Sequence, residues 1–163
     1  MSTEGKLYLV STPIGNLEDI TLRALSVLKS VDLIAAEDTR HTRQLLSHFD
    51  IHTRLVSFHA FNEHRKAEGL IGQILGGLKV ASVSDAGTPS VADPGFYLVR
   101  EAVRNGIVPE VIPGVSAVTF AVTASALPVD KFAFLGFPPV KSGRRRKFFE
   151  AIREENKTVF FFE

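Results

Sequence analysis

The side chain of Asp85 stands where an apolar run of the chain gives way to a loop rich in glycine and proline. The run 79–84 consists largely of small and β-branched residues and is typical of a buried strand. The loop 86–89 supplies a permissive glycine and a rigid proline, so its backbone can approach a ligand closely. Ligands of open parallel sheets bind beyond the carboxyl ends of the strands. We therefore interpret Asp85 as an acceptor for a hydroxyl or amine group, with a plain aspartate-capped turn as the alternative.

Four other loops occupy the same position, each directly after a short apolar run. They are residues 11–16, 37–40, 59–65 and 113–117. The first and last are rich in proline, glycine and hydroxyl groups, whereas the middle two carry charged and imidazole side chains. Because the strands of a β-α-β sheet run the same way, all five loops are expected on one edge. That edge would form a crevice lined by backbone and a few polar groups.

The elements around these loops alternate between strand and helix, which indicates an α/β fold with a parallel sheet. The apolar runs that predict its strands are 7–10, 31–36, 55–58, 79–84 and 108–112. Asp19 or Thr21 is expected to open the first helix, and Asp93 to cap the helix that includes Pro94. The helix 117–126 is small and apolar all round, which predicts that it is buried.

Composition excludes several classes of site. The 163 residues include no cysteine, so a disulfide framework and a thiolate metal site are absent. The first strand-end loop lacks both the G-x-G-x-x-G dinucleotide fingerprint and the G-x-x-x-x-G-K-[ST] phosphate loop. No apolar run reaches the roughly 18 residues of a membrane span, and the N-terminus lacks a signal-peptide pattern. The net charge of +1 says little, but five cations fall within residues 141–147.

The composition changes near residues 127–128, which predicts domains at 1–126 and 127–163. The elements expected in the second domain are a strand at 132–137, a cationic loop at 141–147, a helix at about 147–156 and an aromatic strand at 158–163. One strand–helix–strand unit with a run of phenylalanines cannot bury itself. The second domain is therefore expected to be truncated, with only its beginning present.

Four segments carry a specific pattern in this order and spacing: Ser11–Leu17, Glu37–Arg40, Ser84–Pro89 and Pro113–Ala117. Together they resemble the tetrapyrrole methylase superfamily of S-adenosylmethionine-dependent methyltransferases. Within it they are most similar to the branch that methylates small-subunit ribosomal RNA. The wider superfamily has Gly-Asp-Pro where this chain has Ser84-Asp85-Ala86, a departure that is typical of that branch.

The resemblance implies two α/β/α domains with S-adenosylmethionine in the cleft between them, and a homodimer. Here that means a parallel-sheet N-terminal domain followed by the start of a second, mixed-sheet α/β domain. The implied activity is 2′-O-methylation of the ribose of a cytidine in bacterial 16S ribosomal RNA, without a metal, in the cytoplasm. The implied cofactor contacts are Pro13, Asp85, Gly87, Thr88, Ser116 and Ala117.

A ribose 2′-hydroxyl is a weak nucleophile, so a base or an orienting group assists its attack. The candidates on strand-end loops are Asp38, Arg40, His59 and Asn62. Alternatively, Asp38 and Arg40 pair with each other, His59 is an ordinary packed histidine, and positioning of the substrate alone is sufficient.

The cationic loop is the expected contact with ribosomal RNA of the 30S subunit. Its cations are Lys141, Arg144, Arg145, Arg146 and Lys147, and a solvated surface turn is the alternative interpretation. A methylase of a small tetrapyrrole needs no such loop, so that second enzymatic hypothesis is less favoured. A non-enzymatic ligand-binding module is the third.

Overall fold

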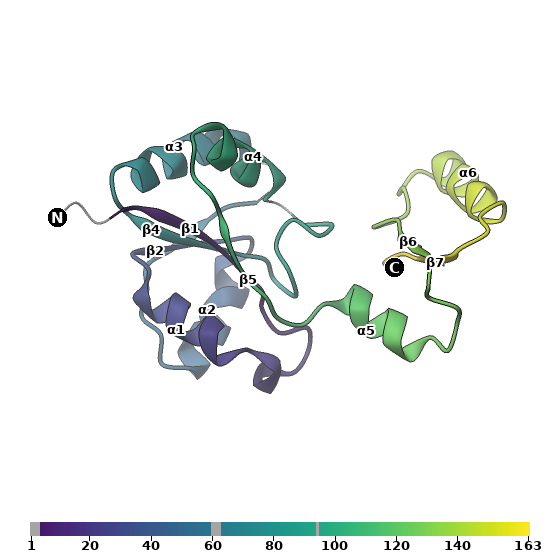
Figure 1. Cartoon of the computed structure of the whole chain (residues 1–163), viewed down its shortest axis with the longest axis horizontal. Helices are drawn as coiled ribbons and strands as arrows, with labels where there is room; N and C mark the ends of the chain where they lie inside the picture. The colour runs from purple at the N-terminus through teal and green to yellow at the C-terminus, as the bar shows by residue number, and fades with distance from the viewer. Residues whose placement is uncertain (1–3, 60–62, 94) are drawn as a thin grey trace. The chain divides into compact units, whose positions relative to one another are not determined.

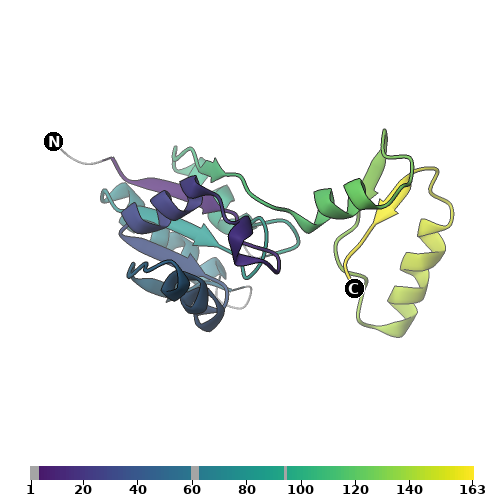
Figure 2. The same ribbon diagram turned by 90° about the horizontal axis from the view of Figure 1, so that it is seen from below.

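Five short apolar runs form one parallel sheet in the computed structural model, which describes residues 4–59, 63–93 and 95–163. The strands are β1 (Lys6–Val10), β2 (Leu33–Ala36), β3 (Leu55–Ser57), β4 (Lys79–Val83) and β5 (Glu110–Ile112). Their order is β3-β2-β4-β1-β5, and they lie side by side and point the same way (Figure 2). The predicted parallel sheet is confirmed, and the carboxyl ends of its strands lie on one edge. Of the loop predicted at 59–65, residues 60–62 lie outside the described residues.

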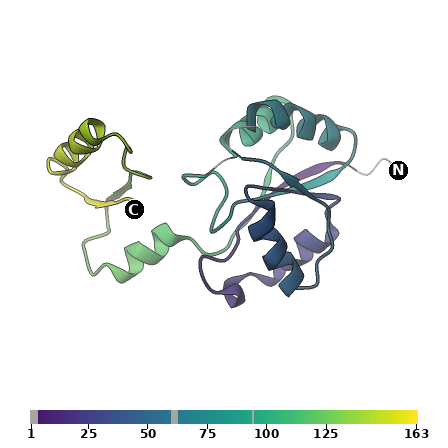
Figure 3. The same cartoon turned by 180° about the vertical axis from the view of Figure 1, so that it is seen from behind.

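Helices cover both faces of this sheet. They are α1 (Leu22–Ser30), α2 (Thr39–His48), α3 (Glu63–Leu75) and α4 (Phe96–Arg104), and a short 3-10 helix, η1 (Leu17–Asp19), precedes α1. α1 and α2 lie on one face, and α3 and α4 lie on the other (Figure 1), as the view from behind also shows (Figure 3). No helix within the described ranges is long and apolar enough to cross a membrane.

Alternation along each strand separates two hydrophobic cores. In β2, Leu33 and Ala35 pack with residues of α3 and α4, whereas Ile34 and Ala36 pack with residues of α1 and α2. All four side chains are buried. A strand that is covered on both faces consists of a continuous apolar run, and this is why the sequence pattern predicted β2.

The connections leave β2 and β4 in opposite directions. From β2 the chain passes through α2 to β3, and from β4 it passes through α4 on the other face to β5. Since β2 and β4 are neighbours, the two connections diverge and open a crevice at their carboxyl ends. The sequence placed Asp38 and Asp85 at these two strand ends.

Two helix starts test the predicted caps. Thr21 caps α1 through a hydrogen bond from the backbone N–H of Ala24 to its hydroxyl (3.0 Å), as expected. The expected cap Asp93 is wrong, because α4 begins at Phe96 with Gly95 in the capping position. The carboxylate of Glu63, at the start of α3, accepts the N–H groups there instead.

A second unit, residues 117–163, follows the first unit, residues 1–116. It contains α5 (Ala117–Ala124), β6 (Phe132–Phe134), α6 (Ser142–Ile152) and β7 (Thr158–Phe160). β6 and β7 pair in parallel, and α6 lies beside them (Figure 2). The rings of Phe148 and Phe149 on α6 contact the ring of Phe161, which follows β7. The predicted boundary at 126–127 falls within this unit, since α5 belongs to it.

Two expectations for the second unit are wrong. None of the residues of α5 is buried, and Phe120 is 69% exposed, because in this unit the helix has its main contact with β7 alone. The cationic segment is not a loop, because α6 begins at Ser142 and includes four of the five cations, with Lys141 in the N-cap position. Arginine and lysine favour helix, and Arg146 adds an ion pair one turn ahead, with Glu150 (2.9 Å).

Glu63 provides a test of the fold, because its buried Oε1 accepts the backbone N–H groups of Gly95 (2.8 Å) and Tyr97 (2.9 Å). Glu63→Ala leaves both donors without this acceptor, so we expect the free energy of unfolding to fall by about 1–3 kcal/mol. Glu63→Gln keeps an acceptor oxygen and should lose less. Urea denaturation followed by circular dichroism measures both, and the exposed Glu68→Ala is the control. Equal midpoints for the two alanine variants would contradict the capping role.

Candidate functional site

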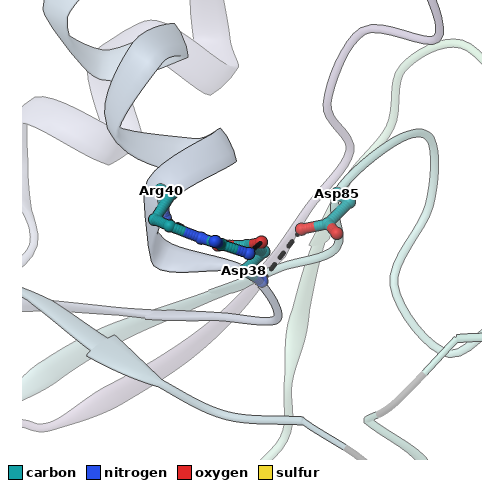
Figure 4. A network of polar contacts seen from close by, with 3 residues as sticks. All are labelled: Asp38, Arg40 and Asp85. Atoms are coloured by element: carbon teal, nitrogen blue, oxygen red, sulfur yellow. Dashed lines mark hydrogen bonds and ion pairs between the residues drawn. The ribbon is translucent and has the colours of Figure 1, made fainter.

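Asp85 bridges the crevice between β2 and β4. Its Oδ1 accepts a hydrogen bond from the backbone N–H of Asp38 (2.9 Å; Figure 4). This bond joins residues that are 47 positions apart and ties the loop after β4 to the start of α2. Because only one carboxylate oxygen makes this bond, the second remains a candidate acceptor for a ligand at the crevice.

The loops after β1 and β4 form a second connection. Thr12 and Gly87 exchange both backbone hydrogen bonds (2.9 and 3.0 Å) in a short antiparallel bridge. The hydroxyl of Thr12 donates to the carbonyl of Ser84 (3.1 Å), and the hydroxyls of Ser11 and Thr88 lie 3.0 Å apart. We refer to these contacts between residues 11–12 and 84–88 as the loop clamp.

Two glycines make the clamp sterically possible. Gly87 has φ +80°, in the left-handed region that residues with a side chain rarely adopt. Gly114, in the loop after β5, lies so close to the clamp that a Cβ added to it would be 2.8 Å from the Cβ of Ser11. The loops after β1, β4 and β5 are therefore fitted together by backbone contact.

A cavity of about 190 Å³ opens beside the clamp at this edge. Its lining residues are Thr12, Pro13, Gly15, Leu17, His41, Gln44, Leu45 and Asp85. Pro13 and Asp85 were predicted site residues, whereas His41 and Gln44 were missed. Both belong to the first turns of α2, and their spacing of three residues on a helix that follows a strand-end loop was the available signal.

Asp38 and Arg40 pair with each other, as the alternative interpretation allowed. Arg40 donates to Asp38 through Nη2 (2.7 Å) and Nε (3.1 Å), and its backbone N–H also donates to the same carboxylate (2.8 Å; Figure 4). These bonds hold the pKa of Asp38 far below its ordinary value. Asp38 is therefore a weak proton acceptor that caps α2 and positions Arg40.

Two further carboxylates at this edge have the opposite shift. Burial, followed by the charges of Asp93 and Asp85, raises the pKa of Glu37. Burial and then the charge of Asp85 raise the pKa of Asp93 as well. The edge thus concentrates negative charge, and these two groups take up protons at a higher pH than ordinary carboxylates do.

The other predicted site residues have different locations. His59 follows β3 and is half-buried, and Asn62 lies outside the described residues. Ser116 ends the first unit, and Ala117 begins α5 in the second. The cations Lys141, Arg144, Arg145, Arg146 and Lys147 are exposed at the start of α6, also in the second unit.

Comparisons with known proteins give a consistent result. The sequence profile of the family described as Tetrapyrrole (Corrin/Porphyrin) Methylases matches residues 6–163. The chain is 51% identical, over 99% of its length, to a protein of Escherichia coli named ribosomal RNA small subunit methyltransferase I. It is 48% identical, over 98% of its length, to the protein of the same name from Halalkalibacterium halodurans. The chain spans 57% and 55% of the lengths of these two relatives.

The fold also matches a solved structure. A uroporphyrin-III-C-methyltransferase from Thermus thermophilus superposes with a TM-score of 0.62 at 28% sequence identity. The match covers 83% of this chain and 60% of that protein. The predicted α/β fold, with a parallel sheet in the first unit and a second, smaller α/β unit after it, is therefore confirmed. A mixed sheet in the second unit stays a prediction, since β6 and β7 pair in parallel.

Gly114→Ala tests the fit of the three loops. Because the added Cβ would lie 2.8 Å from that of Ser11, we expect the free energy of unfolding to fall by about 1–3 kcal/mol through overpacking. Gly72→Ala on α3 is the matched control, since nothing lies within 4 Å of its new Cβ. That change should leave stability equal, or raise it by up to about 1 kcal/mol. Urea denaturation compares the two, and equal stabilities would contradict the close fit.

Proposed function

Since the chain belongs to the tetrapyrrole (corrin/porphyrin) methylases, we propose that it is an S-adenosylmethionine-dependent methyltransferase of ribosomal RNA. Its substrate would be the ribose 2′-hydroxyl of a cytidine in the 16S RNA of the small subunit, in the cytoplasm. The observation that carries this proposal is the 51% identity, over 99% of the chain, to a protein named ribosomal RNA small subunit methyltransferase I. The cytidine and its ribose 2′-hydroxyl come from the sequence resemblance. A homodimer and the 30S subunit as partner belong to the same proposal.

The charge at the strand-end edge suits this cofactor. S-adenosylmethionine carries a sulfonium and an ammonium group, and the carboxylates of Glu37, Asp85 and Asp93 interact with one another at the edge. A cation placed among them relieves their mutual repulsion. The cavity of about 190 Å³ is smaller than the roughly 300–1,000 Å³ of a pocket that encloses a whole ligand. We therefore assign it a part of the cofactor only.

Backbone groups would provide much of the remaining binding. Pro13 and Thr88 adjoin the Thr12–Gly87 bridge of the loop clamp, which fixes the direction of their carbonyl groups and of the N–H of Thr88. Gly87 has no side chain and so lets a ligand come close to the backbone. Ser116 and Ala117 precede and begin α5, and the N–H groups at the start of a helix suit a carboxylate such as that of the cofactor. Asp85 would accept a hydrogen bond from the cofactor through the oxygen that Asp38 does not use.

The bound cofactor supplies an electrophilic methyl group on a positively charged sulfur. The protein must then hold the acceptor oxygen in line with that methyl group, about 3 Å away, and exclude water. The acceptor hydroxyl also loses its proton. We assign Asp38 and Arg40 to positioning of the substrate, because their pairing makes Asp38 a weak base. Glu37, with its raised pKa, and His59 remain the candidate proton acceptors.

Contact with RNA is proposed for the cations at the start of α6. The first turn of this helix contains no acidic residue, and positive charge at a helix N-terminus opposes the helix dipole. Among the described residues, Arg146 alone of these cations forms an ion pair, with Glu150. Phosphate groups of RNA would offset both the dipole and the mutual repulsion of Lys141, Arg144 and Arg145.

A small-molecule methylase is the second candidate, and the structural similarity to a uroporphyrin-III-C-methyltransferase favours it. That similarity is at 28% identity, however, against 51% for the relative named for ribosomal RNA. The cationic start of α6 also has no evident use in binding a tetrapyrrole. The RNA substrate is therefore the better-supported proposal.

Transfer of a radioactive methyl group tests the function directly. Purified protein with methyl-labelled S-adenosylmethionine is expected to label 16S RNA in small subunits, and mass spectrometry should locate the label on a cytidine ribose. Asp85→Asn should weaken cofactor binding at least tenfold in calorimetry, because a hydrogen bond to a charged group contributes roughly 1.5–3 kcal/mol. The asparagine oxygen can still accept the N–H of Asp38, so the fold should persist.

Asp50→Asn is the control, because this exposed aspartate lies in the loop between α2 and β3. Its affinity for the cofactor should equal that of the wild type. Labelling of uroporphyrinogen III but not of RNA would overturn the RNA proposal in favour of the second candidate. Unchanged affinity in Asp85→Asn would remove Asp85 from the cofactor site.

The raised pKa values of Glu37 and Asp93 predict how binding depends on pH. A bound cation favours the ionised carboxylates, so binding should lower both pKa values and release protons. Affinity for S-adenosylmethionine should then fall as the pH drops from neutrality toward these raised pKa values. S-adenosylhomocysteine lacks the sulfonium charge and should show a weaker dependence. Calorimetry across pH measures both profiles, and parallel profiles would contradict an electrostatic role for the edge.

A further inference from the structure

A groove runs along the outer edge of the sheet, between β3 and α3. It has a volume of about 270 Å³, and its lining includes Arg54, Val56, Arg65, Lys66, Gly69 and Gln73. It shares no lining residue with the cavity at the loop clamp. Gly69 keeps it open on the side of α3, because nothing lies within 4 Å of the position that a Cβ would take there.

Three cations line this groove without a carboxylate among its lining residues. In the part of the chain that the structure describes, none of Arg54, Arg65 and Lys66 forms an ion pair. The whole chain has a formal net charge of only +1, so this is a local concentration of positive charge. Arg54 and Arg65 are exposed, which leaves their guanidinium groups accessible.

The edge of β3 contributes to the same surface. β3 is the last strand of the sheet and pairs with β2 alone. The backbone groups of Arg54 and Phe58 bond to β2, so the backbone N–H and carbonyl groups of Leu55 and Ser57 point away from the sheet. Lys66 Nζ donates to the outward carbonyl of Ser57 (2.5 Å). The ammonium group is thereby fixed at the strand edge while its charge stays unneutralised.

We propose that this groove binds the phosphodiester backbone of the ribosomal RNA substrate. The proposal rests on the proposed function and adds a second RNA-binding surface, in the first unit. The groove is open and smaller than the roughly 300–1,000 Å³ of pockets that enclose a small molecule. Two exposed guanidinium groups and a fixed ammonium suit a chain of phosphates, since arginine binds phosphate through paired hydrogen bonds. Such contacts position the RNA without reading its sequence.

The test compares variants that each remove two charges. Arg54→Gln/Arg65→Gln alters the groove but leaves Lys66 and its bond to Ser57 intact. Arg23→Gln/Lys29→Gln is the matched control, because both residues are exposed on α1, on the opposite face of the sheet. Arg54→Lys/Arg65→Lys keeps the charge. The affinity of purified protein for 16S ribosomal RNA is measured against salt concentration, and affinity for S-adenosylmethionine is measured by calorimetry.

Removal of two phosphate contacts should reduce the slope of log affinity against log salt by roughly 1.4 units for single-stranded RNA. If the lines for wild type and groove variant meet near 1 M salt, affinity at 0.1 M should fall by about 25-fold. For the control on α1 and for the lysine variant, the slope of log affinity against log salt should stay close to that of the wild type. Affinity for S-adenosylmethionine should equal that of the wild type in all variants, which also shows that they are folded.

The possible failures are distinguishable. A wild-type protein that binds S-adenosylmethionine but no RNA would overturn the proposed function and the groove with it. A wild type with strong, salt-dependent RNA binding and a groove variant with the same slope as the α1 control would overturn the groove alone. Loss of binding to heparin but not to RNA in the groove variant would likewise overturn it, in favour of another polyanion.

Discussion

The divergence of the chain at neighbouring strands β2 and β4 is the constraint on which the site depends. This divergence opens a crevice between the loop after β2 and the loop after β4. The two loops would be independent of each other if no hydrogen bond joined them. The hydrogen bond from the N–H of Asp38 to Asp85 closes that gap, and a bond of this charged type contributes roughly 1.5–3 kcal/mol. The antiparallel bridge between Thr12 and Gly87 connects the loop after β1 to the loop after β4. The four segments that carry the family resemblance are thus connected to one another, and Gly114 of the last segment packs on Ser11 of the first.

The same arrangement concentrates negative charge, which costs stability. Glu37 and Asp93 are partly buried near Asp85, and their pKa values are raised first by burial and then by the neighbouring carboxylates. A carboxyl group whose pKa is raised on folding destabilises the folded state as the pH rises from its unfolded pKa through its folded pKa. At neutral pH the ionised carboxylates at the strand-end edge therefore destabilise the fold, and a bound cation would relieve that destabilisation. Asp38 is the exception, since Arg40 and its capping role satisfy it.

Local patterns predicted the elements whose environment is decided by nearby residues. The apolar runs marked the parallel strands, Thr21 marked the start of α1, and the position of Asp85 after a strand marked the site. Glu63 could not be recognised as the cap of α4, because its partner N–H groups lie 32 and 34 residues away. The run of cations suggested repulsion and a loop, but helix propensity and the pair with Glu150 prevail in α6. His41 and Gln44 were missed because the sequence does not show which face of α2 lies next to the loops after β1 and β4.

The proposed reaction brings together two ligands of opposite charge. Carboxylates at the strand ends attract a sulfonium cofactor, but they repel the phosphates of RNA. At physiological ionic strength a charge is screened beyond about 8 Å, so distant cations cannot cancel this repulsion within the crevice. Under the proposed function, RNA would be bound through cationic contacts on other elements, such as the edge of β3 and α6. It then needs to present only an uncharged ribose hydroxyl to the acidic edge, and the backbone phosphates can remain outside it.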